Sequence, residues 1–228
     1  MVNHSKRYRE AFAKVDRSLV YAPTEAFDLL KSLPAPKFDE TVEVVVRLGI
    51  DPRKSDQLVR GAVSLPKGLG KTVTVVVFAE GDKAEAAREA GADEVGSEDL
   101  AKRIQDGWMD FDVVIASPDM MKHVGKLGKT LGPQGKMPSP KSGTVTPDVA
   151  NAVREFKAGK VEFRTDAGGN VHAPLGKRSF STGDLMENLA AFMDHLIGMR
   201  PPAVKGNFVR RVSVSTTMGP GAFISYGG

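Results

Sequence analysis

Apolar runs of strand length alternate with helix-forming segments through the middle third of the chain. Residues 72–79 and 112–116 are apolar and rich in β-branched side chains, which is typical of strands buried on both faces of a sheet. Three helical segments and one short strand are predicted around them, at residues 83–90, 94–95, 98–105 and from about residue 119. Ser97 is the expected N-cap of the middle helix. This succession predicts a parallel sheet covered by helices, the doubly wound α/β class.

The two ends of the chain have strands in which polar and apolar residues alternate, as in sheets with one buried and one open face. Residues 41–48 (TVEVVVRL) and 207–216 (NFVRRVSVST) show this alternation. A further strand is predicted at residues 59–65. Residues 160–165 and 170–173 are predicted to pair as a hairpin, because the segment between them, DAGG, has the composition of a turn.

Two amphipathic helices accompany these terminal strands, at residues 24–33 and 184–197. Five large apolar residues fall on one face of the second helix. We expect these side chains to be core rather than a recognition stripe: Leu185, Leu189, Phe192, Met193 and Leu196.

Neither end has enough strands and helices to close a core alone, whereas joined they give a mostly antiparallel sheet with two covering helices. We therefore predict an α+β discontinuous domain, residues 1–66 and 160–228, interrupted by an α/β Rossmann-like parallel-sheet domain at residues 67–159. The chain crosses between the two bodies near residues 66–68 and 158–159. A glycine lies at or beside each crossing, so relative motion of the bodies is a hypothesis.

Composition excludes several classes of protein. The 228 residues include no cysteine, which excludes disulfides and thiolate chemistry, and the four histidines are too widely spread for zinc-type ligand spacing. We expect no metal and no cofactor. The N-terminal segment is polar, and no run of eighteen apolar residues occurs, so a membrane is not an expected partner and the predicted location is cytoplasmic.

The net charge of +4 is small, but it is unevenly distributed. The two ends together carry 19 basic against 14 acidic side chains, whereas the middle carries 13 against 14. Residues 120–147 contain no acidic residue at all. Such a run suits a loop that faces phosphates, and a merely solvated surface is an equal alternative on charge alone. Five lysines lie in this run: Lys122, Lys126, Lys129, Lys136 and Lys141.

Two Gly-Lys-Thr triplets, ending at Thr72 and Thr130, raise the alternative of a nucleotide-binding enzyme built on the α/β domain. A phosphate-binding loop needs a glycine five residues before the triplet, and these positions hold Leu65 and His123. The turn after the first parallel strand also contains two carboxylates, Glu80 and Asp82, where a pyrophosphate would have to lie. The sequence therefore disfavours a nucleotide site at either triplet.

Five segments, in this order, resemble the family of the first protein of the bacterial large ribosomal subunit, ribosomal protein L-one. They are KFDETVEV (37–44), LGIDPRKSDQLVRG (48–61), LGPQGKMPSPKSGTV (131–145), KVEFRTD (160–166) and STTMGPG (215–221). The similarity covers nearly the whole chain. It implies a discontinuous RNA-binding domain with a Rossmann-like insertion, in agreement with the architecture predicted above.

The resemblance also implies a function and partners. Members of this family bind large-subunit ribosomal RNA at the mobile side stalk, which helps exit-site tRNA to leave. Bacterial members also repress translation of their own operon by binding its mRNA. The family catalyses no reaction, and we expect a monomer when the protein is off the ribosome.

The RNA-binding positions carried over from the family lie on both parts of the discontinuous domain: Lys37, Phe38, Thr41, Glu43, Arg164, Asp166, Thr217, Met218 and Gly219. Short hydroxyl and carboxylate groups and bare backbone suit the 2′-hydroxyls of a shallow RNA minor groove. Lys37 and Arg164 suit phosphates. Glu43 and Asp166 are unusual beside a polyanion, and each could instead pair with a neighbouring base, such as Arg164 for Asp166.

The sequence leaves open where Phe38 and the Arg210–Arg211 pair lie. Phe38 could stack on RNA, but from the residues alone core is the better prediction. Arg210 and Arg211 are consecutive in a predicted strand, so only one of them can lie on the RNA side of the sheet.

Overall fold

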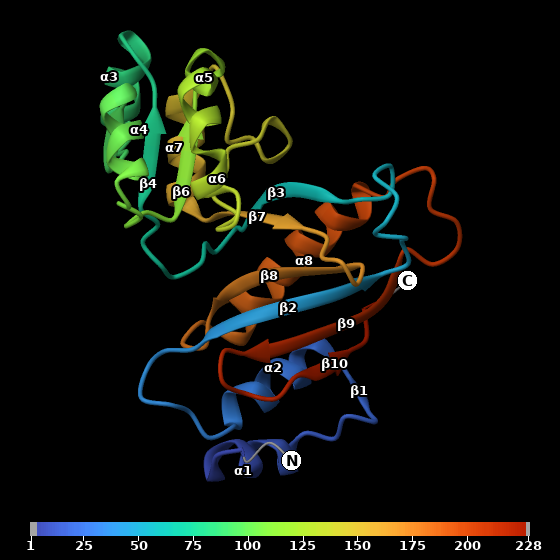
Figure 1. Cartoon of the computed structure of the whole chain (residues 1–228). Helices are drawn as coiled ribbons and strands as arrows, with labels where there is room; N and C mark the ends of the chain where they lie inside the picture. The colour runs from blue at the N-terminus through green and yellow to red at the C-terminus, as the bar shows by residue number, and fades with distance from the viewer. Residues whose placement is uncertain (1–3, 227–228) are drawn as a thin grey trace. The chain divides into compact units, whose positions relative to one another are not determined.

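The computed structural model describes residues 4–226; the first three and last two residues, at the outer ends of the predicted discontinuous domain, lie outside the described part. The chain divides into two compact units, Met1–Gly70 with Val161–Gly228, and Lys71–Lys160 (Figure 1). The sequence places these divisions after residues 66 and 159. Each unit has its own sheet and its own buried core.

The first unit contains a five-stranded sheet. Its strands, in order across the sheet, are β1 (Val20–Tyr21), β10 (Ala222–Ile224), β9 (Val209–Thr216), β2 (Thr41–Leu48) and β8 (Asn170–Lys177). All neighbours are antiparallel except β1 and β10. The neighbouring strands β9 and β2 therefore come from opposite ends of the chain.

Helices α2 (Pro23–Ser32) and α8 (Thr182–Gly198) cover one face of this sheet (Figure 1). The valines at alternate positions of β2 are buried in the same cluster as Phe27 of α2 and Phe192 of α8. All five apolar residues predicted as the core face of α8 are buried, so that prediction is confirmed. The other side chains of β2, β8 and β9 then lie on the uncovered face.

A separate two-stranded sheet is formed by β3 (Arg60–Ser64) and β7 (Lys160–Arg164). Its inward side chains pack on α8, where the Phe163 ring meets the Phe192 ring edge to face at a centroid distance of 5.4 Å. The predicted hairpin is therefore wrong, because β7 pairs with β3 while β8 pairs with β2. Thr165 and Val171 form an isolated bridge, and beyond it each strand takes a partner that is distant in the sequence.

The second unit contains a parallel sheet with helices on both faces, as predicted. The strands lie in the order β5 (Glu94–Gly96), β4 (Val75–Phe78) and β6 (Val113–Ala116). The helices are α3 (Asp82–Glu89), α4 (Glu98–Gln105), α5 (Met121–Val124), α6 (Gly128–Leu131) and α7 (Val149–Ala158), with 3₁₀ turns η1 (Pro118–Met120), η2 (Gly125–Leu127) and η3 (Pro140–Ser142). One face packs Phe78 against Ile104, and the other packs Val77 against Phe156.

Several elements have no counterpart in the sequence prediction: α1 (Lys6–Lys14), α7, β1 and β10. Ser97 occupies the N-cap of α4, but its hydroxyl makes no capping bond. Instead the Asp99 carboxylate accepts from the Ser97 N–H at 3.0 Å. None of the helices in residues 4–226 is long and apolar enough to span a membrane, and these residues contain no acidic and histidine cluster able to hold a metal ion.

Candidate nucleic-acid interface

The uncovered face of the five-stranded sheet carries short polar side chains in register across three strands. Glu43 of β2 lies opposite Ser215 of β9 and Pro174 of β8. Two residues further along β2, on the same face of the sheet, Val45 lies between Ser213 of β9 and His172 of β8. Because β2 and β9 pair directly, residues about 170 positions apart in the sequence lie on one surface.

Thr41 and Thr217 lie side by side at one end of this face. The Thr217 N–H donates to the Thr41 carbonyl at 3.0 Å, and the Thr41 N–H donates to Thr217 Oγ1 at 2.9 Å. Lys177 Nζ donates to Thr41 Oγ1 at 3.1 Å. The Thr217 hydroxyl also donates to the Thr41 carbonyl at 3.3 Å, so its hydrogen is used within the protein, and its oxygen keeps a second lone pair that can accept from a ligand. We call Thr41, Glu43, Thr217, Met218 and Gly219 the composite face.

A buried ion pair holds the turn that follows Thr217. Glu40 is 1% exposed, and its carboxylate accepts from the Met218 N–H at 2.9 Å. Its second oxygen accepts from Arg178 Nη1 at 2.9 Å. The same guanidinium donates to the carbonyls of Lys31 and Leu33 at the end of α2. Both charges are thus satisfied by hydrogen bonds as well as by each other.

The N-terminal helix contributes a second contact to this turn. Arg7 of α1 donates through Nη2 to the Met218 carbonyl at 2.9 Å and through Nη1 to the Pro34 carbonyl at 3.1 Å. Both backbone polar groups of Met218 are therefore held by charged side chains, Glu40 and Arg7. The Met218 side chain itself is 50% exposed and free to contact a ligand.

Lys37 and Phe38 lie in the loop between α2 and β2. Both are exposed, and the prediction that Phe38 is core is wrong, because its side chain is 53% exposed. The buried position of this loop is taken by Glu40, whose charge is compensated by Arg178. An exposed phenyl ring in a loop beside the composite face suits base stacking better than core packing.

Arg164 and Asp166 lie at the opposite end of the sheet, not beside Thr217. Asp166 follows β7, and its N–H donates to the Asn170 carbonyl at the start of β8, which pairs with Arg47 of β2. The side chains of Arg164 and Glu43 are both exposed. Neither side chain has a hydrogen-bond or ion-pair partner among residues 4–226. The expected site residues therefore form two clusters joined by the uncovered face.

Asp166 does not pair with Arg164, contrary to one alternative. Its carboxylate accepts from the backbone N–H groups of Gly168 and Asn170 at 2.8 and 2.7 Å, from the Asn170 amide, and from His172 at 3.2 Å. Burial raises the pKa of this group, but the hydrogen bonds from Asn170, His172 and Gly168 outweigh it and lower the pKa to about 2.

This lowered pKa predicts that Asp166 stays ionised at a pH where ordinary aspartates protonate. The stabilisation it contributes is present above the unfolded pKa of 3.8 and is lost as the pH falls through about 2. Carboxyl-carbon NMR titration measures the midpoint directly. We expect Asp166 to remain charged at about pH 3, and a midpoint near 4 would contradict the hydrogen-bonded geometry.

Arg211, rather than Arg210, lies on the uncovered face. Arg211 is in register with Arg47 of β2, and its guanidinium lies over the Phe223 ring at 4.7 Å from the centroid. The pairing shifts register between Arg47 and Leu48, which leaves Arg210 at an irregularity of the ladder. The strand alternation alone could not reveal this shift.

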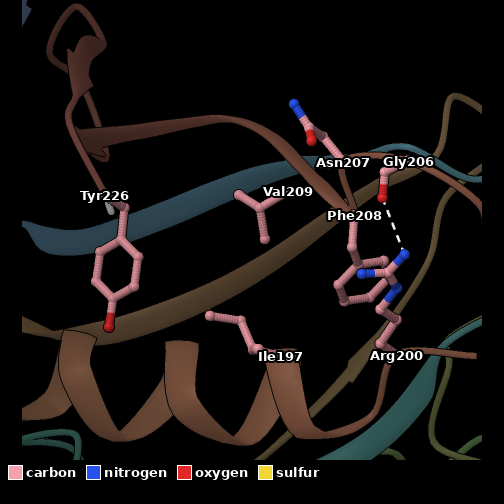
Figure 2. A pocket seen from close by; sticks show the side chains of 7 residues that line it. All are labelled: Ile197, Arg200, Gly206, Asn207, Phe208, Val209 and Tyr226. Atoms are coloured by element: carbon pink, nitrogen blue, oxygen red, sulfur yellow. Dashed lines mark hydrogen bonds between the residues drawn. The ribbon is translucent and has the colours of Figure 1, made fainter. Parts of the chain in front are cut away.

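Two pockets in residues 4–226, one in each unit, are lined by residues other than the predicted site residues. A pocket of about 460 Å³ lies between the end of α8 and the start of β9, and its lining includes Ile197, Phe208, Val209 and Tyr226 (Figure 2). Arg200 also lines this pocket. Its guanidinium donates to the Val204 and Gly206 carbonyls and so holds the loop between α8 and β9.

A pocket of about 270 Å³ lies beyond the ends of β4 and β6, the place where doubly wound sheets bind nucleotides. Three carboxylates line it: Glu80, Asp82 and Asp119. The only cation there, Lys83, is paired with Asp119 at 2.9 Å. This charge repels a nucleotide phosphate, which argues against the nucleotide-binding alternative.

Comparison with known proteins shows the family. Residues 29–220 match the family described as Ribosomal protein L1p/L10e. Over 227 residues the chain is 55% identical to the "Large ribosomal subunit protein uL1" of Mycobacteroides abscessus, covering all of this chain and 97% of that protein. It is 55% identical over 223 residues to the protein of that name from Cutibacterium acnes, covering 98% and 96% of the two chains.

A third relative, from a Nocardioides species, carries the same name and is 54% identical over 220 residues, covering 96% of this chain and 92% of its own. All three are named as proteins of the large ribosomal subunit, and none is named as an enzyme. The chain therefore belongs to the ribosomal protein L1p/L10e family, the family that its five sequence segments resemble.

Proposed function

We propose that the protein binds large-subunit ribosomal RNA at the side stalk through the uncovered face of its discontinuous unit. The observation that carries this proposal is the junction of Thr41 and Thr217, which joins the two ends of the chain into one surface. Family membership supplies the partner, since the relatives are proteins of the large ribosomal subunit.

The chemistry of the face suits folded RNA. Threonine hydroxyls and the unpaired Glu43 carboxylate offer short hydrogen-bonding groups to 2′-hydroxyls, and Gly219 lets the backbone approach closely. Arg164 and Lys37, exposed at opposite ends of the surface, suit phosphates. The face is therefore polar and shape-reading in its centre and cationic at its ends.

The same surface accounts for the regulatory role that the family implies. A single face can hold one RNA at a time, so ribosomal RNA and the operon mRNA would compete for it. Protein in excess of ribosomal RNA would then bind its own mRNA and repress translation. Assistance to the release of exit-site tRNA follows from a position on the side stalk, and the inserted α/β unit has the fold expected of the family.

Thr217→Val tests the composite face. The substitution removes both hydrogen bonds of the hydroxyl to the Thr41 backbone and the oxygen that can accept from a 2′-hydroxyl, so we expect the affinity for a side-stalk RNA fragment to fall by about 10-fold. Filter binding at fixed salt measures this change.

Thr217→Ser is the matched control, because it keeps the hydroxyl and should bind within about twofold of the wild type. Circular dichroism of both variants checks the fold. Wild-type affinity in Thr217→Val would remove this hydroxyl from the site. Equal affinity of the wild type for the stalk fragment and for random duplexes would refute specific recognition altogether.

A further inference from the structure

A continuous helical run in the second unit, from η1 through α5 and η2 to α6, has two opposite faces. One face is buried in the core of that unit and consists of Met120, Val124, Leu127 and Leu131. Their spacings of four, three and four residues keep them on one side of a helix. The opposite side carries exposed lysines at the same kind of spacing: Lys122, Lys126 and Lys129.

These three lysines have no carboxylate partner in residues 4–226, and residues 120–147 contain no acidic residue. Asp119, which precedes this run, pairs with Lys83 at 2.9 Å, and Lys122 adds only the last of the contributions that lower the pKa of Asp119. Lys136 of the same basic segment differs, since its Nζ donates to the Phe111 carbonyl at 2.6 Å and lies over the Phe111 ring. Lys136 therefore has a structural role, whereas the three helical lysines form no salt bridge or side-chain hydrogen bond in residues 4–226.

Gly125 lies among these lysines, three residues after Lys122 and four before Lys129. Its backbone is ordinary helix, with φ −57° and ψ −33°, so the conformation does not require glycine. A Cβ placed there would meet nothing within 4 Å, so packing within the protein does not require glycine either. Glycine is the poorest helix former after proline. A bare helical backbone between cations fits a partner that approaches from outside to van der Waals contact.

We propose that Lys122, Gly125, Lys126 and Lys129 form a second RNA contact, which binds the sugar–phosphate backbone of large-subunit ribosomal RNA. The surface offers cations and bare backbone but no aromatic or acceptor groups, so it reads phosphates rather than base edges. The helical rise spaces the charges by about 6 and 4.5 Å along the axis, which suits successive phosphates of one strand. This inference rests on the proposed function, because the same RNA is the partner.

The test is the salt dependence of binding to a ribosomal RNA fragment that contains the whole side stalk. In the variant Lys122→Gln, Lys126→Gln, Lys129→Gln we expect the slope of log affinity against log salt to become shallower by about 2 to 3. The control variant removes three lysines of the same unit that do pair with carboxylates: Lys71→Gln, Lys102→Gln, Lys157→Gln. Its slope should stay within about one of the wild-type value.

The variant Gly125→Ala tests close approach of RNA to the helix backbone without changing the charge of the surface. Alanine should raise the melting temperature by about 2 to 4 °C, because it favours the helix, yet lower the RNA affinity at least about threefold by blocking the approach. Unchanged affinity in Gly125→Ala, or equal slopes in the two triple variants, would overturn the inference.

Two further outcomes are distinguishable. If the helical lysine variant loses affinity for tRNA but not for the ribosomal fragment, the surface serves tRNA and the inference is wrong. If the wild type itself fails to bind the fragment, the proposed function fails instead.

Discussion

Glu40→Ala is expected to lower the free energy of unfolding of the discontinuous unit by about 3 to 5 kcal/mol, because it leaves the Arg178 guanidinium buried without its counter-charge. Glu40 is 1% exposed and the Arg178 side chain is 14% exposed, so little water reaches the pair. Urea denaturation, followed by a probe in this unit, measures the change.

Glu40→Ala should also weaken RNA binding, measured under conditions where this variant is folded. Removal of Glu40 frees the Met218 N–H, and the bond from Arg7 to the Met218 carbonyl then holds only the following peptide group. We expect the affinity for the stalk fragment to fall by at least about 10-fold, since an interaction with a turn that is no longer preorganised costs ordering entropy.

A double substitution separates stability from positioning. Replacing Glu40 and Arg178 together by methionine removes both charges and should restore most of the stability, since a buried pair is often no more stabilising than apolar residues. RNA affinity should remain low, because the Met218 N–H still lacks its acceptor. Full RNA affinity in the double variant would show that the pair serves the fold alone.

The strand pattern determined much of this architecture in advance. Residues 41–48 alternate so regularly that the predicted and observed limits of β2 coincide, and the core face of α8 follows from helical spacing. The union of the two ends was predicted from the number of strands available to each. The adjacency of Thr41 and Thr217 follows from that union, because only a β2–β9 pairing places both at one sheet end.

The buried ion pair that supports the composite face could not be predicted from the sequence, because it depends on long-range geometry rather than on local pattern. Glu40 and Arg178 are 138 positions apart, and nothing in their neighbouring residues indicates a buried pair. The error on Phe38 has the same origin, since a charged residue two positions later takes the buried place.

The failure of the hairpin has a different physical cause. The turn chemistry of residues 166–169 was recognised correctly, and Asp166 closes it with hydrogen bonds to Gly168 and Asn170. Turn sequence fixes how the chain reverses but not how long the two arms stay paired. Long-range pairing decides that, because beyond the Thr165–Val171 bridge β7 pairs with β3 and β8 pairs with β2. Arg164 and Asp166 lie away from the composite face because Asn170, which bonds to Asp166, is in register with Arg47 at the other end of β2.

Gly219→Ala is expected to reduce affinity for the stalk fragment by about 10- to 100-fold. The backbone there does not have a positive φ, so the reason is steric rather than conformational. A Cβ at this position would lie 2.3 Å from Thr216 Oγ1, and Thr216 is only 5% exposed. Overpacking of this kind costs about 1 to 3 kcal/mol, and the exposed turn is the part that can move to relieve it.

Removal of the obstructing hydroxyl should reverse the effect. In Gly219→Ala with Thr216→Ala the nearest remaining side-chain atom is Thr216 Cβ at 3.6 Å, an ordinary contact, so the turn can return to its place. Thr216→Ala alone should bind RNA within about threefold of the wild type, because its hydroxyl lies on the core face of β9. Recovery in the double variant shows that the position of the Met218–Gly219 backbone governs recognition. If the double variant binds as weakly as Gly219→Ala, the added methyl group itself collides with RNA, and Gly219 is then a direct contact rather than a positioning residue.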